Sequence, residues 1–541
     1  MRSNKPLPLL AVGLAAGLYL ALALYQVYLP GLHYDEAREA GVPAMQILLG
    51  QPLDPFRGSA LRVGGRDWPL MVQDYIGALN AYLAVPFLAL GGVRVASLRL
   101  LPVLCGLATL LLVWDLARRA YSERAASLAA ILLAVQPAFV FWNRQGLYVT
   151  SITATLFALA LWSGWRWLKE GRRRWWVLAA LACGLGLWAK LLFLWALGAM
   201  VGAWALLAWG RWARALPRCD PLGLLLAGAA FAVPLVPLAL FNWQTSGTLL
   251  TVVRNLGHSY YGVDNLAFGR NLAARLLQVR DVLAGTPFWY LGGTFEDPWW
   301  PPALALGALG SLAHVLRRGA VPVRRLLFPY LALALIVVQS CFTVSALWHS
   351  HFVLALPLPA LALAATLDAL ARAGRGKKVL EVLPMLAAAF LALWDLGVDV
   401  RYHRALAQTG GLGGHTEAIY ALAERLRDAP HPQPLALDWG IAAPVEFLTG
   451  GEVRPLEVFG YESLEQPDEG FRERIRPLVR EPGRYHLFHA PEETVYRGRL
   501  EAYQAVLEEE GLQGQVVAVV HDRSGRLIFV VGEALPASGA P

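Results

Sequence analysis

Repeated apolar segments, each long enough to cross a bilayer, constrain this chain more than any other feature. Of the 541 residues, 57% are hydrophobic and only 16% are charged, whereas about a quarter of the residues of a soluble protein are charged. A helix needs about 20 apolar residues to span a membrane. The sequence therefore predicts a polytopic α-helical membrane protein with about 11 transmembrane helices. Candidate spans lie at 7–30, 95–117, 124–142, 147–168, 174–189, 191–210, 222–241, 300–316, 326–346, 351–371 and 379–398.

The N-terminal segment resembles a signal peptide only at first sight. Its uncharged run from Pro6 to Leu32 has 27 residues and no small-residue cleavage site follows it, so it is too long for a signal peptide. We interpret it as a retained first span.

Basic residues mark one side of the membrane. Clusters of two to five Lys or Arg residues occupy alternate connections, while the short connections between them hold only Arg144 and Lys190. The positive-inside rule places the clusters, and with them the N-terminus, in the cytoplasm of a multi-pass inner or plasma membrane protein. The net charge of +8 therefore does not indicate nucleic acid binding. The basic clusters lie in segments 1–6, 117–124, 166–174, 211–218, 317–325 and 372–378.

This topology gives the external face three long segments. Residues 31–94 form the first loop only if 68–92 lies at the interface as a helix instead of crossing the membrane. A second loop covers 242–299. After about residue 399, strand-like and helix-like patterns alternate, which is typical of a small α/β domain. We therefore divide the chain into a transmembrane domain, 1–399, and an extracytoplasmic α/β domain, 400–541.

The stretch "HYDEAREA", 33–40, places two acids and a cation just after the first span. Asp35 and Glu36 are either solvated residues at a helix N-terminus or functional groups, because ionisable residues near the hydrocarbon are costly. A carboxylate there could act as a general base or bind a cation. Arg38 lies on the same helical face as Asp35 and either forms an intrahelical ion pair or binds phosphate.

Further polar residues are expected at the same membrane level. Lys190 either extends to the interface or binds a lipid phosphate, and Arg99 and Arg144 would complete a ring of cations suited to a phosphate head group. Aromatic residues at an interface are first of all anchors, with substrate contact as the second interpretation. The candidates for contact with acceptor or sugar are His349 and His351 in "WHSHF" and His258 and Tyr261 in "GHSYYG".

Several segments together resemble the GT-C type glycosyltransferases, in particular the bacterial relatives of protein O-mannosyltransferases and of the lipid A aminoarabinose transferase. The resemblance covers residues 1 to about 400. Its strongest element is the acidic motif, here "YDEAREA", at the end of the first span. The other elements, in order, are "WPLMVQDYIGALNAYL", "GGVRVASLRLLPVLCGLATLLLVWDLARRAYS", "GLGLWAKLLFLW" and "HSHFVLALPLPALAL".

The resemblance implies a sugar donor linked to polyprenyl phosphate and an inverting transfer on the extracytoplasmic face. Asp35 would be the base that activates the acceptor, with Glu36 as its partner, and Arg38 and Lys190 would hold the donor phosphate. The sequence departs from the aminoarabinose transferases at Trp68, where they have Lys, and at Thr150 and Ser151, where they have Asp. The late segment has His351 and Phe352 instead of Arg-Tyr.

Two other functions remain open at this stage. A transporter or flippase of lipid-linked sugars would also need cations near the membrane surface, although transporters typically show internal duplication and broken helices. A non-catalytic GT-C scaffold would bind only lipid or a partner protein. A divalent metal ion is left open as a cofactor, and the acceptor (protein, lipid or glycan) is not identified. The expected partners are a polyprenyl-phosphate-linked sugar and membrane lipids.

Overall fold

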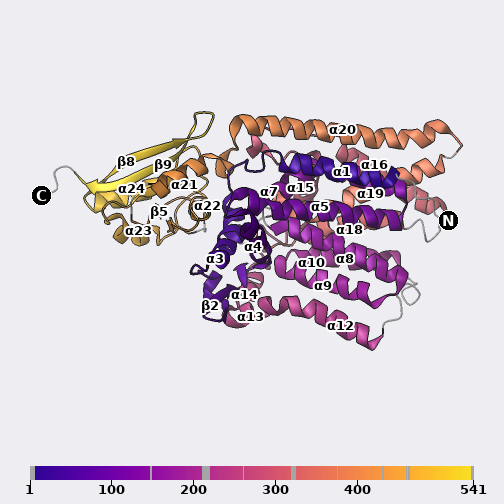
Figure 1. Cartoon of the computed structure of the whole chain (residues 1–541), viewed down its shortest axis with the longest axis horizontal. Helices are drawn as coiled ribbons and strands as arrows, with labels where there is room; N and C mark the ends of the chain where they lie inside the picture. The colour runs from indigo at the N-terminus through magenta and orange to yellow at the C-terminus, as the bar shows by residue number, and fades with distance from the viewer. Residues whose placement is uncertain are drawn as a thin grey trace.

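The protein has two parts, a long helical bundle and a smaller domain with a sheet, placed end to end (Figure 1). The computed structural model describes residues 7–145, 149–209, 220–259, 261–318, 325–345, 347–374, 376–428, 432–458, 460 and 463–537. The N-terminal end of α1 lies at the bundle's far end, and the described chain ends in the sheet domain.

Leucine- and alanine-rich helices form the bundle, as expected where the backbone must satisfy its own hydrogen bonds. Among the described residues, three helical stretches are long and apolar enough to span a membrane, or five if the bent pairs α6–α7 and 349–373 each count as one span. The count of 11 spans stays a prediction. The bundle helices are α1 (Leu7–Leu24), α5 (Val95–Ala120), α6 (Glu123–Ala134), α7 (Pro137–Gln145), α8 (Thr150–Glu170), α9 (Arg173–Ala189), α10 (Phe193–Leu207), α12 (Pro221–Ala232), α13 (Val236–Thr245), α16 (Trp300–Arg318), α18 (Phe328–Gln339), α19 (Pro357–Ala373) and α20 (Lys378–Thr409).

The first loop folds over the end of this bundle, between the bundle and the sheet domain (Figure 1). Its helix α4 (Leu79–Gly91) has 13 residues, a length of roughly 20 Å, which is too short to cross the hydrocarbon core. The helix predicted over 68–92 is therefore wrong in its first part, because residues 68–77 form the end of β2 and the strands β3 and β4. The interfacial placement stays a prediction. The loop also contains α2 (Tyr34–Glu36), a π-helix (Ala37–Gly41), α3 (Val42–Leu49), β1 (Ala60–Val63), β2 (Arg66–Pro69), β3 (Met71–Gln73) and β4 (Ile76–Gly77).

The second loop contributes α14 (Gly247–Arg254), α15 (Phe268–Ala284) and a 3₁₀ turn (Trp289–Leu291). Asp74 of the first loop connects to it: its main-chain oxygen accepts a hydrogen bond from Thr248 Oγ1 at 2.6 Å and its Oδ2 one from Thr251 Oγ1 at 2.9 Å. The two external loops are therefore joined by hydrogen bonds.

The C-terminal domain has a five-stranded sheet in the order β6-β5-β7-β9-β8. Strand β5 pairs in parallel with β6 and β7, and β9 pairs antiparallel with β7 and β8. Helix α20 continues to Thr409, ten residues past the boundary predicted at 399. The elements of this domain are α21 (Ala418–Asp428), β5 (Leu435–Ala436), α22 (Ala442–Leu448), β6 (Leu456–Glu457), α23 (Phe471–Val479), β7 (His486–His489), α24 (Arg499–Glu509), β8 (Leu512–His521) and β9 (Leu527–Pro536).

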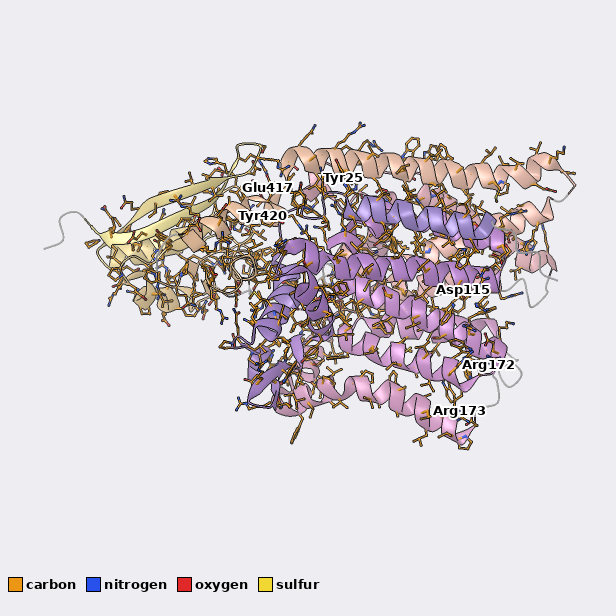
Figure 2. The ribbon with its side chains drawn as sticks, in the orientation of Figure 1. Tyr25, Asp115, Arg172, Arg173, Glu417 and Tyr420 are labelled. Carbon is orange, nitrogen blue, oxygen red and sulfur yellow. The ribbon has the colours of Figure 1, made fainter. Side chains whose placement is uncertain are left out.

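Labelled residues mark the two ends of the bundle. Asp115, Arg172 and Arg173 lie at the end away from the sheet domain, whereas Tyr25, Glu417 and Tyr420 lie at the junction with it (Figure 2). The side of the membrane on which each end lies stays a prediction.

Candidate active site

The acidic stretch forms a short capped helix followed by a π-helix. The Nδ1 of His33 accepts the backbone N–H of Asp35 at 3.2 Å, and Glu36 Oε1 accepts the N–H of His33 at 3.4 Å. The wider turns of the π-helix Ala37–Gly41 follow at once, and such turns occur often at functional sites.

Asp35 is the most accessible acid of this stretch, with 14% of its side chain exposed. Its Oδ2 lies 3.8 Å from His33 Nδ1. It is within electrostatic range of Lys190 on one side and of Tyr261 and Tyr496 on another. Asp35 therefore lies where the first loop, the turn between α9 and α10, the second loop and the sheet domain meet.

Lys190 lies in the turn between α9 and α10 and is 1% exposed. The turn is attached to the first loop by a backbone bridge between Lys190 and Ile76 and by the N–H of Leu191, which donates to Tyr75 O at 2.9 Å. Burial lowers the pKa of the Lys190 ammonium, while the negative charges of Glu39 and Asp35 act in the opposite direction.

Glu39 lies within electrostatic range of this lysine and is 2% exposed. Burial raises its pKa to about 8, against the lowering effect of Lys190. Gln73 Nε2 donates to Glu39 Oε1 at 3.1 Å. Burial therefore favours the protonated form of this carboxyl, beside a buried amine and Asp35.

Glu36 has a different partner, Arg99, and both side chains are 1% exposed. The guanidinium donates to both carboxylate oxygens at 2.8 Å and to the carbonyls of Val27, Pro30 and Gly31 at 2.8, 2.9 and 3.1 Å. All five N–H groups of Arg99 are thereby used. Its role in phosphate binding stays a prediction, and the geometry disfavours it.

The remaining predicted cations lie outside this cluster. Arg144 is fully buried in α7 and donates to the carbonyls of Tyr25 and Gln26 at 2.5 and 2.8 Å. Arg38 is exposed and lies within electrostatic range of Glu446 in α22. Neither arrangement tests phosphate binding.

The predicted histidines also separate. His351 is 7% exposed and within electrostatic range of Lys190. His349 Nε2 lies 3.4 Å from Asp281 Oδ2. His258 has a side chain that is 68% exposed, with its Nε2 3.9 Å from Asp264 Oδ1. Among the residues predicted to contact the acceptor or sugar, Tyr261 lies within electrostatic range of Asp35.

Comparison with known proteins identifies the architecture. Residues 78–239 match the sequence model of the dolichyl-phosphate-mannose-protein mannosyltransferase family. The structure resembles ArnT from Cupriavidus metallidurans bound to undecaprenyl phosphate, with 14% identity, 98% of each chain covered and a TM-score of 0.62. It also resembles AglB from Archaeoglobus fulgidus in complex with an inhibitory peptide and a dolichol-phosphate, with 15% identity, 100% of this chain and 75% of that chain covered, and a TM-score of 0.53. No curated relative matches the sequence.

The chain has the GT-C fold. The resemblance predicted from the sequence is thereby confirmed. Within this fold, Asp35 and its neighbours lie at the junction of the bundle with the sheet domain, at the end where α1 finishes.

Sequence reasoning missed three residues near Asp35. Glu39 had a signal, because it follows Asp35 by four positions and so shares its helical face. Trp439, whose ring centroid lies 5.5 Å from that of His33, and Tyr496 had none. They come from the sheet domain, and only the tertiary fold brings them to this place.

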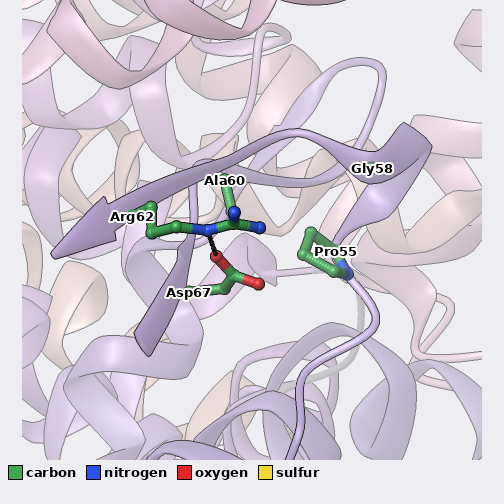
Figure 3. Close-up of a pocket in the computed structure, with 5 residues that line it drawn as sticks. All are labelled: Pro55, Gly58, Ala60, Arg62 and Asp67. Carbon is green, nitrogen blue, oxygen red and sulfur yellow. Dashed lines mark hydrogen bonds and ion pairs between the residues drawn. The ribbon is translucent and has the colours of Figure 1, made fainter. Parts of the chain in front are cut away.

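A pocket of about 370 Å³ lies at the rim of the first loop. Figure 3 shows Arg62 and Asp67 joined across it, with Nε and Oδ1 3.0 Å apart. None of its lining residues belongs to the cluster around Asp35. We assign this pocket no role in the candidate active site.

Within the described residues, no three or more His, Cys, Asp or Glu side chains come together as metal ligands would. The divalent ion considered from the sequence is therefore not assigned to any residues.

Proposed function

We propose that this protein is a glycosyltransferase that moves a sugar from a polyprenyl-phosphate donor to an acceptor on the extracytoplasmic face. The observation that carries the proposal is a partly exposed carboxylate, Asp35, beside a buried cation, Lys190, in the GT-C fold. The structural relatives support the donor class, since one holds undecaprenyl phosphate and another a dolichol-phosphate.

Asp35 is proposed to accept the proton of the acceptor's hydroxyl or amine. The acceptor then attacks the anomeric carbon from the face opposite the phosphate, so the configuration inverts. The bond between the anomeric carbon and the phosphate oxygen breaks, and polyprenyl phosphate leaves with the electron pair. Asp35 suits this role because the other two acids of the stretch are almost fully buried.

Lys190 is proposed to hold the donor phosphate and to stabilise the negative charge that develops on it as it leaves. A fixed cation in a site of low dielectric performs this task well. Arg38 is retained as an outer phosphate contact, while Glu36 and Arg99 are reassigned to holding the loop in place. Tyr261 and Tyr496 are proposed to contact the acceptor or sugar next to Asp35.

Substitution of the base tests this proposal. Asp35→Asn removes the proton acceptor and should reduce transfer by at least about 100-fold, while binding of polyprenyl phosphate persists because Lys190 remains. Transfer is measured with purified protein, membrane acceptors and labelled polyprenyl-phosphate sugars, and lipid binding is measured separately.

The matched control is Asp264→Asn, an acid in the second loop that faces His258. It should transfer sugar at the wild-type rate. If Asp35→Asn transfers at that rate as well, Asp35 is not the base. If the wild-type protein binds polyprenyl phosphate but transfers no sugar from it, the protein is a lipid-binding scaffold or a transporter instead.

A further inference from the structure

Three rings from distant parts of the chain stack behind the acidic stretch. The rings of His33 and His415 lie 4.2 Å apart at 19°, and those of His415 and Tyr290 lie 3.8 Å apart at 16°. All three residues are buried, with exposed fractions of 3%, 9% and 5%. His33 precedes α2, His415 lies in the linker between α20 and α21, and Tyr290 belongs to the second loop.

Hydrogen bonds join the segments that carry the three rings and also hold the Tyr290 ring at its hydroxyl. Gly31 N–H donates to His415 O at 2.8 Å, and Leu412 N–H donates to Tyr290 O at 2.8 Å. The hydroxyl of Tyr290 donates to Gln145 Oε1 at 2.8 Å, which joins the stack to α7. On the other side, the ring of Trp439 meets that of His33 at 67°. The plane of the His33 ring is thus set from three segments.

We propose that His33 is a positioning residue for Asp35 and that the ring stack sets its orientation. The Nδ1 of His33 can accept the N–H of Asp35 only when the ring is turned toward that group. The stack holds this orientation, and it thereby fixes the helical turn that presents the Asp35 carboxylate. The inference rests on the proposed function, in which Asp35 is the base.

The charge state of the imidazoles agrees with this role. An Nδ1 that accepts a hydrogen bond carries no proton, so the hydrogen bond from the Asp35 N–H requires neutral His33. Burial lowers the pKa of His33 and of His415, and the cation of Arg99 lowers both further. The carboxylates of Asp35 and Glu36 act in the opposite direction on His33. The net effect lowers the pKa of His33, which favours the neutral imidazole that the hydrogen bond from the Asp35 N–H requires.

Variants of His415 show whether the ring acts by its flat shape in the stack or by its titratable nitrogens. His415→Phe keeps a flat ring in the stack, whereas His415→Ala removes it, and His415→Leu keeps the volume without the flat ring. The control is His486→Ala in β7, which removes a buried imidazole that contacts Tyr503 at 2.7 Å inside the sheet domain. Two quantities are measured: hydrogen exchange of the Asp35 amide and the kinetics of sugar transfer.

We expect His415→Ala and His415→Leu to speed exchange of the Asp35 amide by about tenfold or more and to lower kcat by about 10- to 100-fold, because small misplacements of a catalytic group cost this much. KM should change little, and His415→Phe should restore most of both values. His486→Ala should alter neither. The Leu and Phe variants suffice if the Ala variant does not fold.

Two results would overturn the inference: wild-type amide exchange in both His415→Ala and His415→Leu, or a Phe variant as impaired as the Leu variant. Amide exchange does not depend on catalysis. Faster exchange in the Leu variant, together with a wild-type protein that transfers no sugar, would support the role of the ring stack and refute the proposed function.

Discussion

Two acids of the same stretch, Glu36 and Glu39, each face a buried basic residue, and the two pairs differ in their hydrogen bonds and in their pKa shifts. Glu36 and Arg99 form a two-pronged pair in which every guanidinium N–H has an acceptor. Glu39 and Lys190 are equally buried, but the pKa of each is shifted toward its neutral form. The first pair is held by two direct hydrogen bonds between its charged groups, whereas in the second pair burial favours the neutral form of each group.

The difference follows from the two cations. A guanidinium is planar, remains charged and offers five fixed donors, which suits a permanent connection among a helix, a loop and a carboxylate. Burial lowers the pKa of an amine and a nearby anion raises it again, so the charge of a buried lysine depends on the anions around it. A phosphate placed next to Lys190 would favour the charged form. We infer that the first pair supports the architecture and the second the chemistry.

The largest expected effect comes from breaking the first pair. Glu36→Gln leaves the charge of Arg99 buried without its carboxylate, which should lower the free energy of unfolding by about 3–5 kcal/mol. Arg99→Lys should also be less stable than the wild type, although it keeps the positive charge, because a lysine cannot supply the five donors. Thermal unfolding of the purified protein in detergent measures both.

If instead Glu36→Gln unfolds like the wild type and loses only its affinity for polyprenyl phosphate, the comparison fails. Arg99 would then be a phosphate ligand, as the sequence predicts.

The second expected effect concerns catalysis. Lys190→Met should reduce transfer by about 100- to 1,000-fold, the usual cost of losing one group that stabilises the transition state, with little change in unfolding temperature. Arg38→Met, at the exposed outer phosphate contact, should lower transfer by no more than about tenfold, because water screens its charge. The matched control is Arg62→Met, a cation of the same loop that is 81% exposed and pairs with Asp67, and it should transfer at the wild-type rate. Steady-state kinetics with a labelled donor distinguish the three variants.

Equal losses in the Lys190 and Arg38 variants would show that both cations hold the donor phosphate. A stable Lys190→Met protein with unchanged transfer would remove Lys190 from the mechanism.

The sequence predicted the fold well because its signals are local and repeated. Apolar length indicates helices, and the charge of the turns separates the two ends of the bundle. The acidic motif after the first span and the lone lysine between α9 and α10 were likewise visible as charged residues next to apolar segments.

The contacts among these residues were not visible. Nothing local indicates that Glu36 rather than Asp35 pairs with Arg99, because that contact depends on how α2 packs against α5 in the tertiary fold. Arg38 shares a helical face with Asp35 in an ideal α-helix, yet it lies exposed near Glu446. His415 and Tyr290 are ordinary loop residues until the tertiary fold stacks them on His33.

The smallest expected effect is a pH dependence due to Glu39. Its pKa is about 8 in the folded protein, against 4.5 for an ordinary glutamate. Because the folded-state pKa is the higher one, the stabilising contribution is complete below about pH 4.5 and is lost as the pH rises through about 8. Relative to Glu39→Gln, which stays neutral, the wild-type protein should therefore lose about 1 kcal/mol of unfolding free energy per pH unit between about pH 5.5 and 7.5. Denaturant unfolding of both proteins across this pH range measures the slope. If the wild type instead gains stability relative to the variant as the pH rises, Glu39 is ionised and paired with Lys190, as Glu36 is with Arg99.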